Sequence, residues 1–283
     1  FHEVSREPEL IKRMIEQGYT GRKGKGGFYR LKPDTADKIK EAVDLETGEY
    51  RKAEKPKLES VSAAKKGGLR ALVGYSDKTG RYAWWVLSRT LSYAARLVPE
   101  ISDDITGVDD AMRLGYNWKF GPFELIDKLG SGWFAERLKK DGMEVPKLLE
   151  VAAGRSFYRT ENGRLQFLRL DGAYQDVVRP DGVLLLADIK RRQQPLVKNR
   201  SASLWDIGDG VLCLEFHSKM NSLNPFILSM IEKAIRRVLD GYKALVVYNE
   251  GSNFSVGANI GILLVAMKLR AWFAVRYLVG QGQ

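Results

Sequence analysis

A strand and the loop that follows it, near the end of the chain, have residue types and spacing suited to stabilising an anion. Residues 244–248 (ALVVY) form an uninterrupted apolar run, which predicts a strand covered on both faces. The turn formers of residues 249–253 follow, and then the small residues FSVGAN at 254–259. A small-residue loop after a strand exposes backbone N–H groups, which can hold a carbonyl oxygen that becomes an oxyanion. A tight structural turn explains the same spacing equally well.

This loop resembles the oxyanion loop of the crotonase (enoyl-CoA hydratase) family, which also follows a core strand. The resemblance extends back to Leu204 and includes KMNSL at 219–223, and the two segments together are more specific than either alone. It implies a catalytic role for the backbone N–H of Ala258, which would polarise a thioester carbonyl. The implied contacts to a coenzyme A thioester are Met220, Val256, Gly257, Asn259 and Ile260. Many members have aspartate where Asn259 stands and lysine where Gly261 stands, so this chain departs from the family at the phosphate contact.

A second resemblance covers about residues 1–160. The loop GRKGKGGFY at 21–29, the segment DAMRLG at 110–115 and the segment GPFELID at 121–127 resemble the C-terminal helical domain of 3-hydroxyacyl-CoA dehydrogenases. The two resemblances imply a fused β-oxidation protein with the dehydrogenase first. Its NAD domain would precede Phe1 and its crotonase glutamates would follow Gln283, so we expect this chain to be an interior fragment.

The expected fold class is α+β, with a mainly helical dehydrogenase C-terminal-type domain followed by the N-terminal β/α part of a crotonase-like fold. The predicted domains are residues 1–160 and 203–283, joined by a linker with short strands at 161–202. Residues 164–170 and 183–187 are the strands expected in that linker. In the last part, a hairpin over 204–216, a helix capped by Asn224 and the strand at 244 predict a parallel crossover.

The helical part has its own expected boundaries. A helix over 8–17 ends at Gly18, a hairpin turns at Thr47-Gly48, and a helix over 59–73 has a weak point at Gly67-Gly68. The helix over 82–98 should be buried over much of its surface, with Tyr82, Trp85, Val86, Tyr93 and Leu97 on one face, widened by Trp84, Leu87, Leu91 and Val98. Another helix should end at Gly115, and the next should begin at Pro122.

Composition excludes several classes of function. The 283 residues are 44% hydrophobic and carry a net charge of +11, which suits a folded protein with an anionic ligand. Two histidines and the single Cys213 predict no metal site and no disulfide framework. We expect no transmembrane helix, no signal peptide, no nucleic-acid partner and a cytoplasmic location.

Several residues have an alternative to a functional role. The loop at 21–29 could cradle phosphate, but it lacks the P-loop and Rossmann spacings, so a solvated loop is the preferred interpretation. Turn and capping roles explain Asp109 and Asp110. Glu250 is interpreted as a loop-surface acid, and His217 as a satisfied or exposed histidine.

The sequence therefore predicts a fragment of a fatty-acid β-oxidation enzyme that binds acyl-CoA and is inactive alone. The parent would oxidise 3-hydroxyacyl-CoA with NAD, for which this chain offers no binding residues, and would hydrate enoyl-CoA. The alternative is a non-catalytic scaffold segment with weak or no CoA binding. An incomplete crotonase core would leave apolar faces open, which predicts a homo-oligomer.

Overall fold

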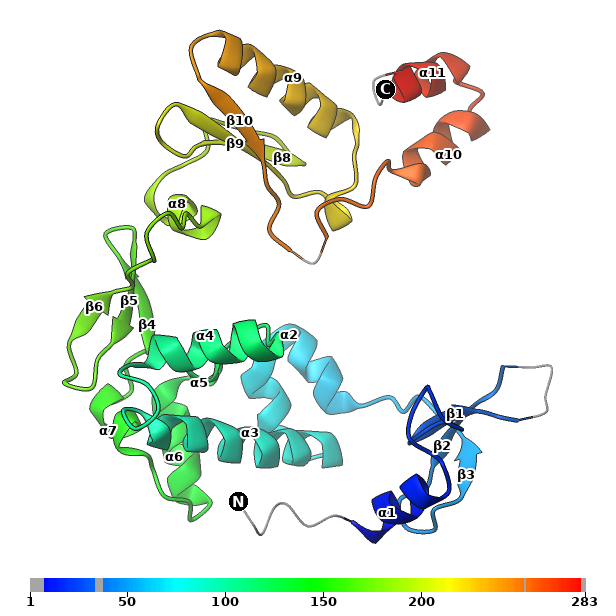
Figure 1. The fold of residues 1–283 in the computed structure, drawn as a ribbon, viewed down its shortest axis with the longest axis vertical. Coiled ribbons are helices and arrows are strands. Elements are labelled where there is room, and N and C mark those ends of the chain that lie inside the picture. Colours follow the sequence, from blue (N-terminus) through cyan, green and yellow to red (C-terminus); the bar gives the residue numbers. More distant parts are fainter. Residues whose placement is uncertain (1–7, 34–37, 252, 281–283) are drawn as a thin grey trace. The chain divides into compact units, whose positions relative to one another are not determined.

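The computed structural model describes residues 8–33, 38–251 and 253–280. The chain folds as two units, residues 1–81 and residues 82–283, and each is described by itself. Helices and sheets occur in both units (Figure 1). This mixture confirms the α+β class, whereas the crotonase-like identity of the last part stays a prediction.

The first unit combines two helices with a three-stranded antiparallel sheet. Its first helix ends where Gly18 adopts a φ of 84°, a conformation that favours glycine after a helix. Its second helix is kinked at Gly68, inside the predicted weak point, and the last two strands form the hairpin predicted at Thr47-Gly48. The elements are α1 (Glu9–Glu16), β1 (Tyr29–Leu31), β2 (Lys40–Val43), β3 (Tyr50–Lys52) and α2 (Glu59–Gly74).

Five helices share an aromatic core in the first part of the second unit. The rings of Phe123 and Phe157 meet edge to face with centroids 5.0 Å apart, and Phe134 is fully buried with them in the core. The helix predicted to start at Pro122 does so. The elements are α3 (Lys78–Leu97), α4 (Ile105–Tyr116), α5 (Pro122–Leu129), α6 (Ser131–Lys140) and α7 (Lys147–Ala152).

The burial predicted for α3 is wrong for its central face and confirmed for Trp84 and Leu91. Tyr82, Trp85 and Tyr93 are 66%, 48% and 51% exposed. Serine and alanine side chains occupy the rest of the inner face, and a pattern based on large apolar residues does not mark them. The buried residues of α3 are Gly80, Trp84, Ser88, Leu91, Ser92, Ala94 and Ala95, and Val98 directly after the helix is buried as well.

The predicted end of α4 at Gly115 is one residue too early. The helix continues to Tyr116, and Asn117 takes the left-handed conformation at its end, with a φ of 56°. Asparagine is one of the few residues that adopts this conformation readily, so the helix does not need a glycine to end.

Two carboxylates, the buried Asp109 and the half-buried Asp127, connect α5 to its neighbours. Asp109 accepts hydrogen bonds from the N–H of Phe123 at 2.8 Å and of the following residue at 3.2 Å, at the start of α5. Asp127 accepts from the N–H of Phe157 at 2.7 Å and of Tyr158 at 2.8 Å. The capping role predicted for Asp109 is confirmed, although it caps the next helix rather than its own.

A three-stranded antiparallel sheet and a short helix follow. The strand predicted over 164–170 is present, but the strand predicted over 183–187 is wrong because Leu186 begins a helix. Leu186 and Ile189 are buried three residues apart, a helical spacing that the short apolar run did not reveal. The elements are β4 (Tyr158–Glu161), β5 (Arg164–Leu168), β6 (Tyr174–Asp176) and α8 (Leu186–Arg192).

The last part is organised around a four-stranded sheet, β7 (Val197–Lys198), β8 (Ala202–Asp206), β9 (Val211–Phe216) and β10 (Ala244–Val247). The predicted hairpin is β8 and β9, and β10 lies parallel to β9 with Ala244 opposite Val211. The crossover between them is α9 (Pro225–Leu239), which lies along the sheet (Figure 1). The side chain of Asn224 accepts from the N–H of Phe226 at 3.0 Å, which confirms the predicted cap.

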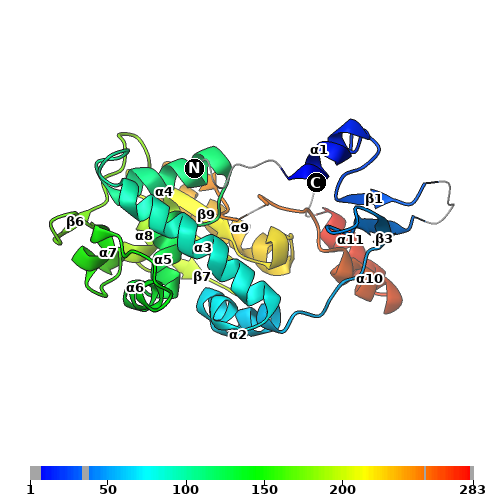
Figure 2. The ribbon, with the colours of Figure 1, turned by 90° about the horizontal axis from the view of Figure 1, so that it is seen from below.

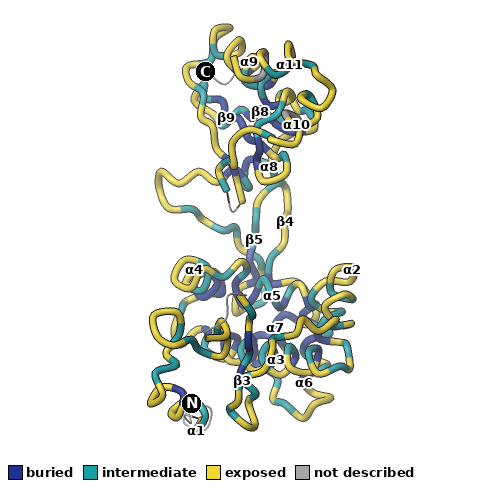
Figure 3. Tube along the Cα trace, turned by 90° about the vertical axis from the view of Figure 1, so that its right-hand side faces the viewer, coloured by how far each residue is buried: buried dark blue, intermediate teal, exposed yellow. Residues whose placement is uncertain are grey.

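The two faces of this sheet are covered by different helices. Leu204, Leu212 and Leu214 are fully buried against Ile227 and Met230 of α9. The opposite face places Trp205 and Cys213 against Leu186 and Ile189 of α8. Buried residues follow β8 and β9 in Figure 3. α8 therefore packs with this sheet, although it lies in the segment that the sequence assigns to a linker.

The prediction that β10 is covered on both faces is wrong. Val246 is 44% exposed and Val247 is 39% exposed. β10 lies at the end of the strand order, and within the described part of the chain no strand pairs with its outer edge. The last two helices, α10 (Ile260–Lys268) and α11 (Trp272–Gly280), lie side by side (Figure 2). No described helix has the length and apolar character needed to cross a membrane.

The buried carboxylate of Asp109 should make stability depend on pH. Burial raises its pKa to about 7, against the lowering effect of the hydrogen bonds from Phe123 and Tyr158. The folded state then holds a proton that the unfolded state releases near pH 4, so this contribution is full below pH 4 and is lost as pH rises toward 7. In the unmodified chain we expect the free energy of unfolding to fall by at most about 4 kcal/mol as pH rises over this range. In D109N this fall should be absent.

Urea unfolding at pH 4, 5.5, 7 and 8 measures this difference between D109N and the unmodified chain. D110N is the matched control, because Asp110 is half-exposed and paired with Arg113. Parallel pH profiles for D109N and the unmodified chain would contradict the expectation.

Candidate functional site

The two segments that the sequence singles out meet at one edge of the four-stranded sheet. β9 and β10 run parallel, so the chain leaves both strands at the same edge. There Leu223 lies opposite Ala258 in a parallel bridge. The N–H of Leu223 donates to Gly257 O at 2.8 Å, and the N–H of Asn259 donates to Leu223 O at 3.0 Å. The pairing joins the segment 219–223 to the loop 254–259.

This pairing sets the direction of the Ala258 N–H group. In a parallel bridge Leu223 bonds to the residues on both sides of Ala258, so the N–H and C=O of Ala258 point away from Leu223. Ala258 is exposed, and its N–H donates to no group among the described residues. The preceding Gly257 has a φ of 80°, a conformation that favours glycine. The geometry leaves a backbone donor available to a ligand.

Two buried asparagines hold the loop in place. Asn249 accepts from the N–H of Phe216 at 2.7 Å and donates to Phe254 O at 2.5 Å. Asn221 donates through Nδ2 to Asn253 O at 2.9 Å, and its own carbonyl accepts from Ser255 Oγ at 2.8 Å. From the sequence Asn249 is expected to be a turn former only, and nothing in a single sequence pairs it with Phe216.

An ion pair from α8 also reaches this loop. The Lys190 ammonium contacts Glu215 of β9 and lies 2.8 Å from Oε2 of Glu250. Glu215 is buried and accepts from the indole N–H of Trp205 at 3.1 Å. Glu250 therefore has a defined partner, and its interpretation as a simple surface acid is incomplete.

The other residues implied by the resemblance are mostly exposed. Met220 is 56% exposed and has a φ of 55° in the short 3₁₀ helix η1 (Lys219–Asn221). Val256 and Ile260 are 47% and 68% exposed. The Asn259 side chain accepts from the N–H of Gly261 at 3.1 Å and so caps α10. The structure thus brings the two segments together, with Asn259 serving as a cap.

The remaining candidate groups have structural partners. His217 Nε2 lies 3.0 Å from Ser203 Oγ, in agreement with a satisfied histidine. Burial raises the pKa of Cys213 to about 11, so this thiol is unreactive at neutral pH. No cluster of three or more His, Cys, Asp or Glu side chains within the described ranges is placed to hold a metal ion.

The glycine- and lysine-rich loop between α1 and β1 is closed by its own backbone. The N–H of Gly21 donates to Gly26 O at 2.7 Å, that of Gly24 to Gly21 O at 3.0 Å, and that of Lys25 to Gly18 O at 3.1 Å. Amide groups engaged in this way are not directed at a phosphate. The geometry supports the interpretation as a structural loop.

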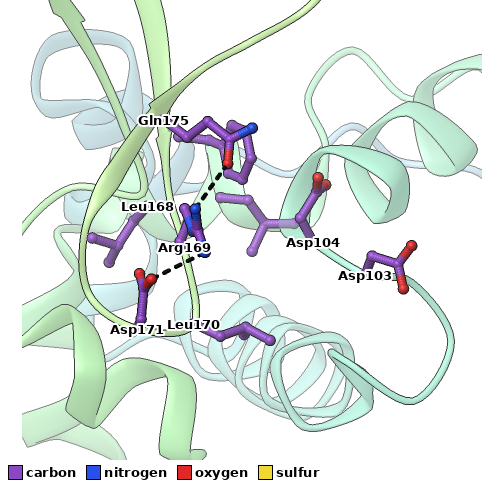
Figure 4. A pocket seen from close by; sticks show the side chains of 9 residues that line it. Asp103, Asp104, Leu168, Arg169, Leu170, Asp171 and Gln175 are labelled. Carbon is purple, nitrogen blue, oxygen red and sulfur yellow. Dashed lines mark hydrogen bonds and ion pairs between the residues drawn. The ribbon is translucent and has the colours of Figure 1, made fainter.

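A pocket of about 370 Å³ lies between the start of α4 and the β5–β6 hairpin (Figure 4). Its Arg169 lies 3.1 Å from Asp171 and 3.4 Å from the Gln175 side chain, and Asp104 caps α4 through the N–H of Thr106 at 2.8 Å. These polar groups therefore serve the local fold. None of the residues implied by the crotonase resemblance lines this pocket.

Comparison with known proteins supports the dehydrogenase part of the resemblance. Residues 83–159 match the family model described as 3-hydroxyacyl-CoA dehydrogenase, C-terminal domain. Over 286 residues the chain is 36% identical to a "Probable 3-hydroxyacyl-CoA dehydrogenase" of Bacillus subtilis (strain 168), covering 99% of the chain and 36% of that relative. It is 28% identical over 265 residues to a "Putative fatty acid oxidation complex trifunctional enzyme" of Rickettsia felis, covering 93% of the chain and 33% of the relative.

The chain spans about a third of the length of these curated relatives. No solved structure matches it significantly. The family match lies within the helical part, so the crotonase-like interpretation of residues 203–283 rests on the residues and geometry described above.

Removing the Asn249 side chain should loosen the loop and destabilise the sheet. N249A would leave the buried N–H of Phe216 without its acceptor, which costs about 1–3 kcal/mol. The measurement is the free energy of unfolding from urea denaturation. Gln194, an exposed amide residue, gives the control Q194A, for which no change is expected. Equal stability of N249A and Q194A would show that the Asn249 hydrogen bonds contribute little.

Proposed function

We propose that this chain is part of a β-oxidation protein and contributes to binding an acyl-CoA thioester. The parent would oxidise 3-hydroxyacyl-CoA with NAD and hydrate enoyl-CoA in the cytoplasm. The match of residues 83–159 and the names of the similar proteins support the dehydrogenase part. The observation that carries the CoA proposal is the outward-directed N–H of Ala258.

In this proposal the Ala258 N–H donates to the thioester carbonyl oxygen. An oxyanion forms at that oxygen when a proton is removed from the neighbouring carbon or when water adds to the enoyl group, so the donor would stabilise the transition state more than the substrate. The rest of the ligand would contact Val256, Gly257, Asn259 and Ile260 on one side and Met220 on the opposite side. The exposure of Met220, Val256 and Ile260 leaves their side chains accessible to a pantetheine-like chain.

We assign no NAD contact to this chain. The family implies NAD for the parent, but the glycine-rich loop at 21–29 follows no strand, and three of its amide groups bond within the loop. Those residues do not fit a dinucleotide. We therefore propose that the chain alone transfers no hydride, and that its part in the parent is to bind and orient the acyl-CoA.

The second candidate is a non-catalytic scaffold segment. The exposed apolar side chains of β10, α10 and α11 favour it, because exposed apolar surface commonly marks a contact with another protein surface. A homo-oligomer formed through these side chains agrees with both candidates. We propose no nucleic-acid partner for either.

Calorimetric titration with acetoacetyl-CoA tests the proposal, and A258P isolates the donor. Proline at 258 removes the outward N–H but leaves both hydrogen bonds to Leu223, which use Gly257 O and the Asn259 N–H. We expect saturable binding by the unmodified chain and about three- to tenfold weaker binding by A258P, as for the loss of one hydrogen bond. A258S keeps the N–H and is the control.

Absence of binding to the unmodified chain at millimolar ligand would favour the scaffold. Equal affinity of A258P and A258S for acetoacetyl-CoA would show that the Ala258 N–H does not contact the ligand, even if the chain binds CoA elsewhere. Turnover of acetoacetyl-CoA with NADH by this chain would contradict the proposed lack of hydride transfer.

A further inference from the structure

The described residues 249–251 and 253–259, between β10 and α10, form a loop that is held by three separate parts of the chain. Asn249 attaches it to the end of β9, and Asn221 attaches it to the segment after β9. The third attachment is different because it comes from α8, sixty residues earlier in the sequence, through Lys190 and Glu250. Asn249 and Asn221 bond to residues that lie between the start of β9 and α10 in the sequence. Lys190 instead connects the loop to α8, which precedes the four-stranded sheet in the sequence.

We propose that Lys190 is a positioning residue that sets the conformation of the loop carrying Ala258. This inference rests on the proposed function insofar as that loop binds acyl-CoA. Lys190 would act through Glu250, without touching the ligand. In this proposal α8, which carries Lys190, is part of the site, although the sequence predicts that α8 lies in a linker.

The contacts of Lys190 explain how it can fix a loop residue. One ammonium group serves two carboxylates, Glu215 and Glu250. Glu215 is buried and is itself oriented by the indole N–H of Trp205, so it fixes the position of the ammonium group. Glu250 is the more exposed partner and lies on the loop, so the ammonium group of Lys190 fixes the position of Glu250.

Lys190 stays charged at neutral pH. Burial acts to lower its pKa, but the hydrogen bonds and negative charges of Glu215 and Glu250 together outweigh burial and raise it. The ammonium group also lies 6.0 Å from the centre of the Trp205 ring, at the outer limit of a cation–π contact. The attachment of Glu250 is therefore present throughout the pH range in which the chain would bind a thioester.

α8 is well placed to hold the loop because it is itself fixed on two sides. Leu186 and Ile189 pack on the four-stranded sheet. On another side, Gly163 in the β4–β5 turn approaches so closely that a Cβ there would lie 3.1 Å from Arg191 O. A shift of α8 against either neighbour would move Lys190, and with it Glu250.

Hydrogen exchange of peptides covering 249–258 tests the inference without any ligand. E250Q removes the loop partner and leaves the buried Lys190–Glu215 pair intact, so it avoids an unpaired buried charge. We expect exchange in these peptides to rise about two- to fivefold, which corresponds to the loss of one partly exposed ion pair. E9Q is the matched control, because Glu9 forms an exposed ion pair with Lys12 at 3.2 Å in α1.

A second pair of variants separates positioning from general destabilisation. K190M should raise exchange at least as much as E250Q, and K190R should restore part of the protection because it keeps the charge. K12M is the matched control for K190M. If K190M fails to fold because Glu215 is left unpaired, E250Q alone decides. Unchanged loop exchange in E250Q would overturn the inference.

Titration with acetoacetyl-CoA distinguishes this inference from the proposed function. If the unmodified chain binds, E250Q should bind more weakly by about two- to fivefold with an unchanged unfolding midpoint. Equal affinity despite faster loop exchange would show that Lys190 orders the loop but does not position the site, and would overturn the role in binding. If the unmodified chain does not bind, the proposed function fails while the exchange result still decides whether Lys190 fixes the loop.

Discussion

The parallel pairing of β9 with β10 is the constraint on which the candidate site depends. Two parallel strands deliver the chain to the same edge of a sheet, and α9 provides the crossover that this requires. The segment after β9 and the loop after β10 must therefore meet, which allows Leu223 to pair with Ala258. That pairing in turn aims the Ala258 N–H away from Leu223. An antiparallel β10 would deliver its loop to the opposite edge, and neither segment could contact the other.

Buried and half-buried polar side chains hold the local backbone in place in both parts of the second unit. Asp109 and Asp127 satisfy backbone N–H groups around α5, and Asn249 satisfies the N–H of Phe216 at the end of β9. Each provides hydrogen bonds whose loss would leave a buried donor unsatisfied, at a cost of about 1–3 kcal/mol, whereas an exposed ion pair contributes about 0.2–1 kcal/mol. The asparagines therefore contribute most to forming the loop, and the weaker pair of Lys190 with Glu250 sets its conformation once it is formed.

Local signals in the sequence predicted much of this architecture. The cap at Asn224, the weak point at Gly68 and the parallel crossover from β9 to β10 were predicted from turn chemistry and topology. The wrong predictions of burial have a common cause. Whether a side chain is exposed depends on the elements that pack against it, and one segment of sequence does not specify those elements. The aromatic residues of α3 and the run of β10 have the composition of buried elements, yet Tyr82 and Val246 are exposed. The contact of Lys190 with Glu250 spans sixty residues and involves two common surface residue types, so no pattern could predict it.

The exposure of Ala258 limits what its N–H group can contribute in this chain. Removing an oxyanion donor costs about 2.7–4 kcal/mol in an enclosed active site, where water is excluded. An exposed donor competes with water, and its net hydrogen bond is worth about 0.5–1.5 kcal/mol. Contact with the exposed side chains of Val256 and Ile260 adds apolar burial at about 25 cal/mol per Å². These magnitudes favour weak binding of a thioester without catalysis, because strong stabilisation of an oxyanion requires additional protein surface that excludes water from Ala258.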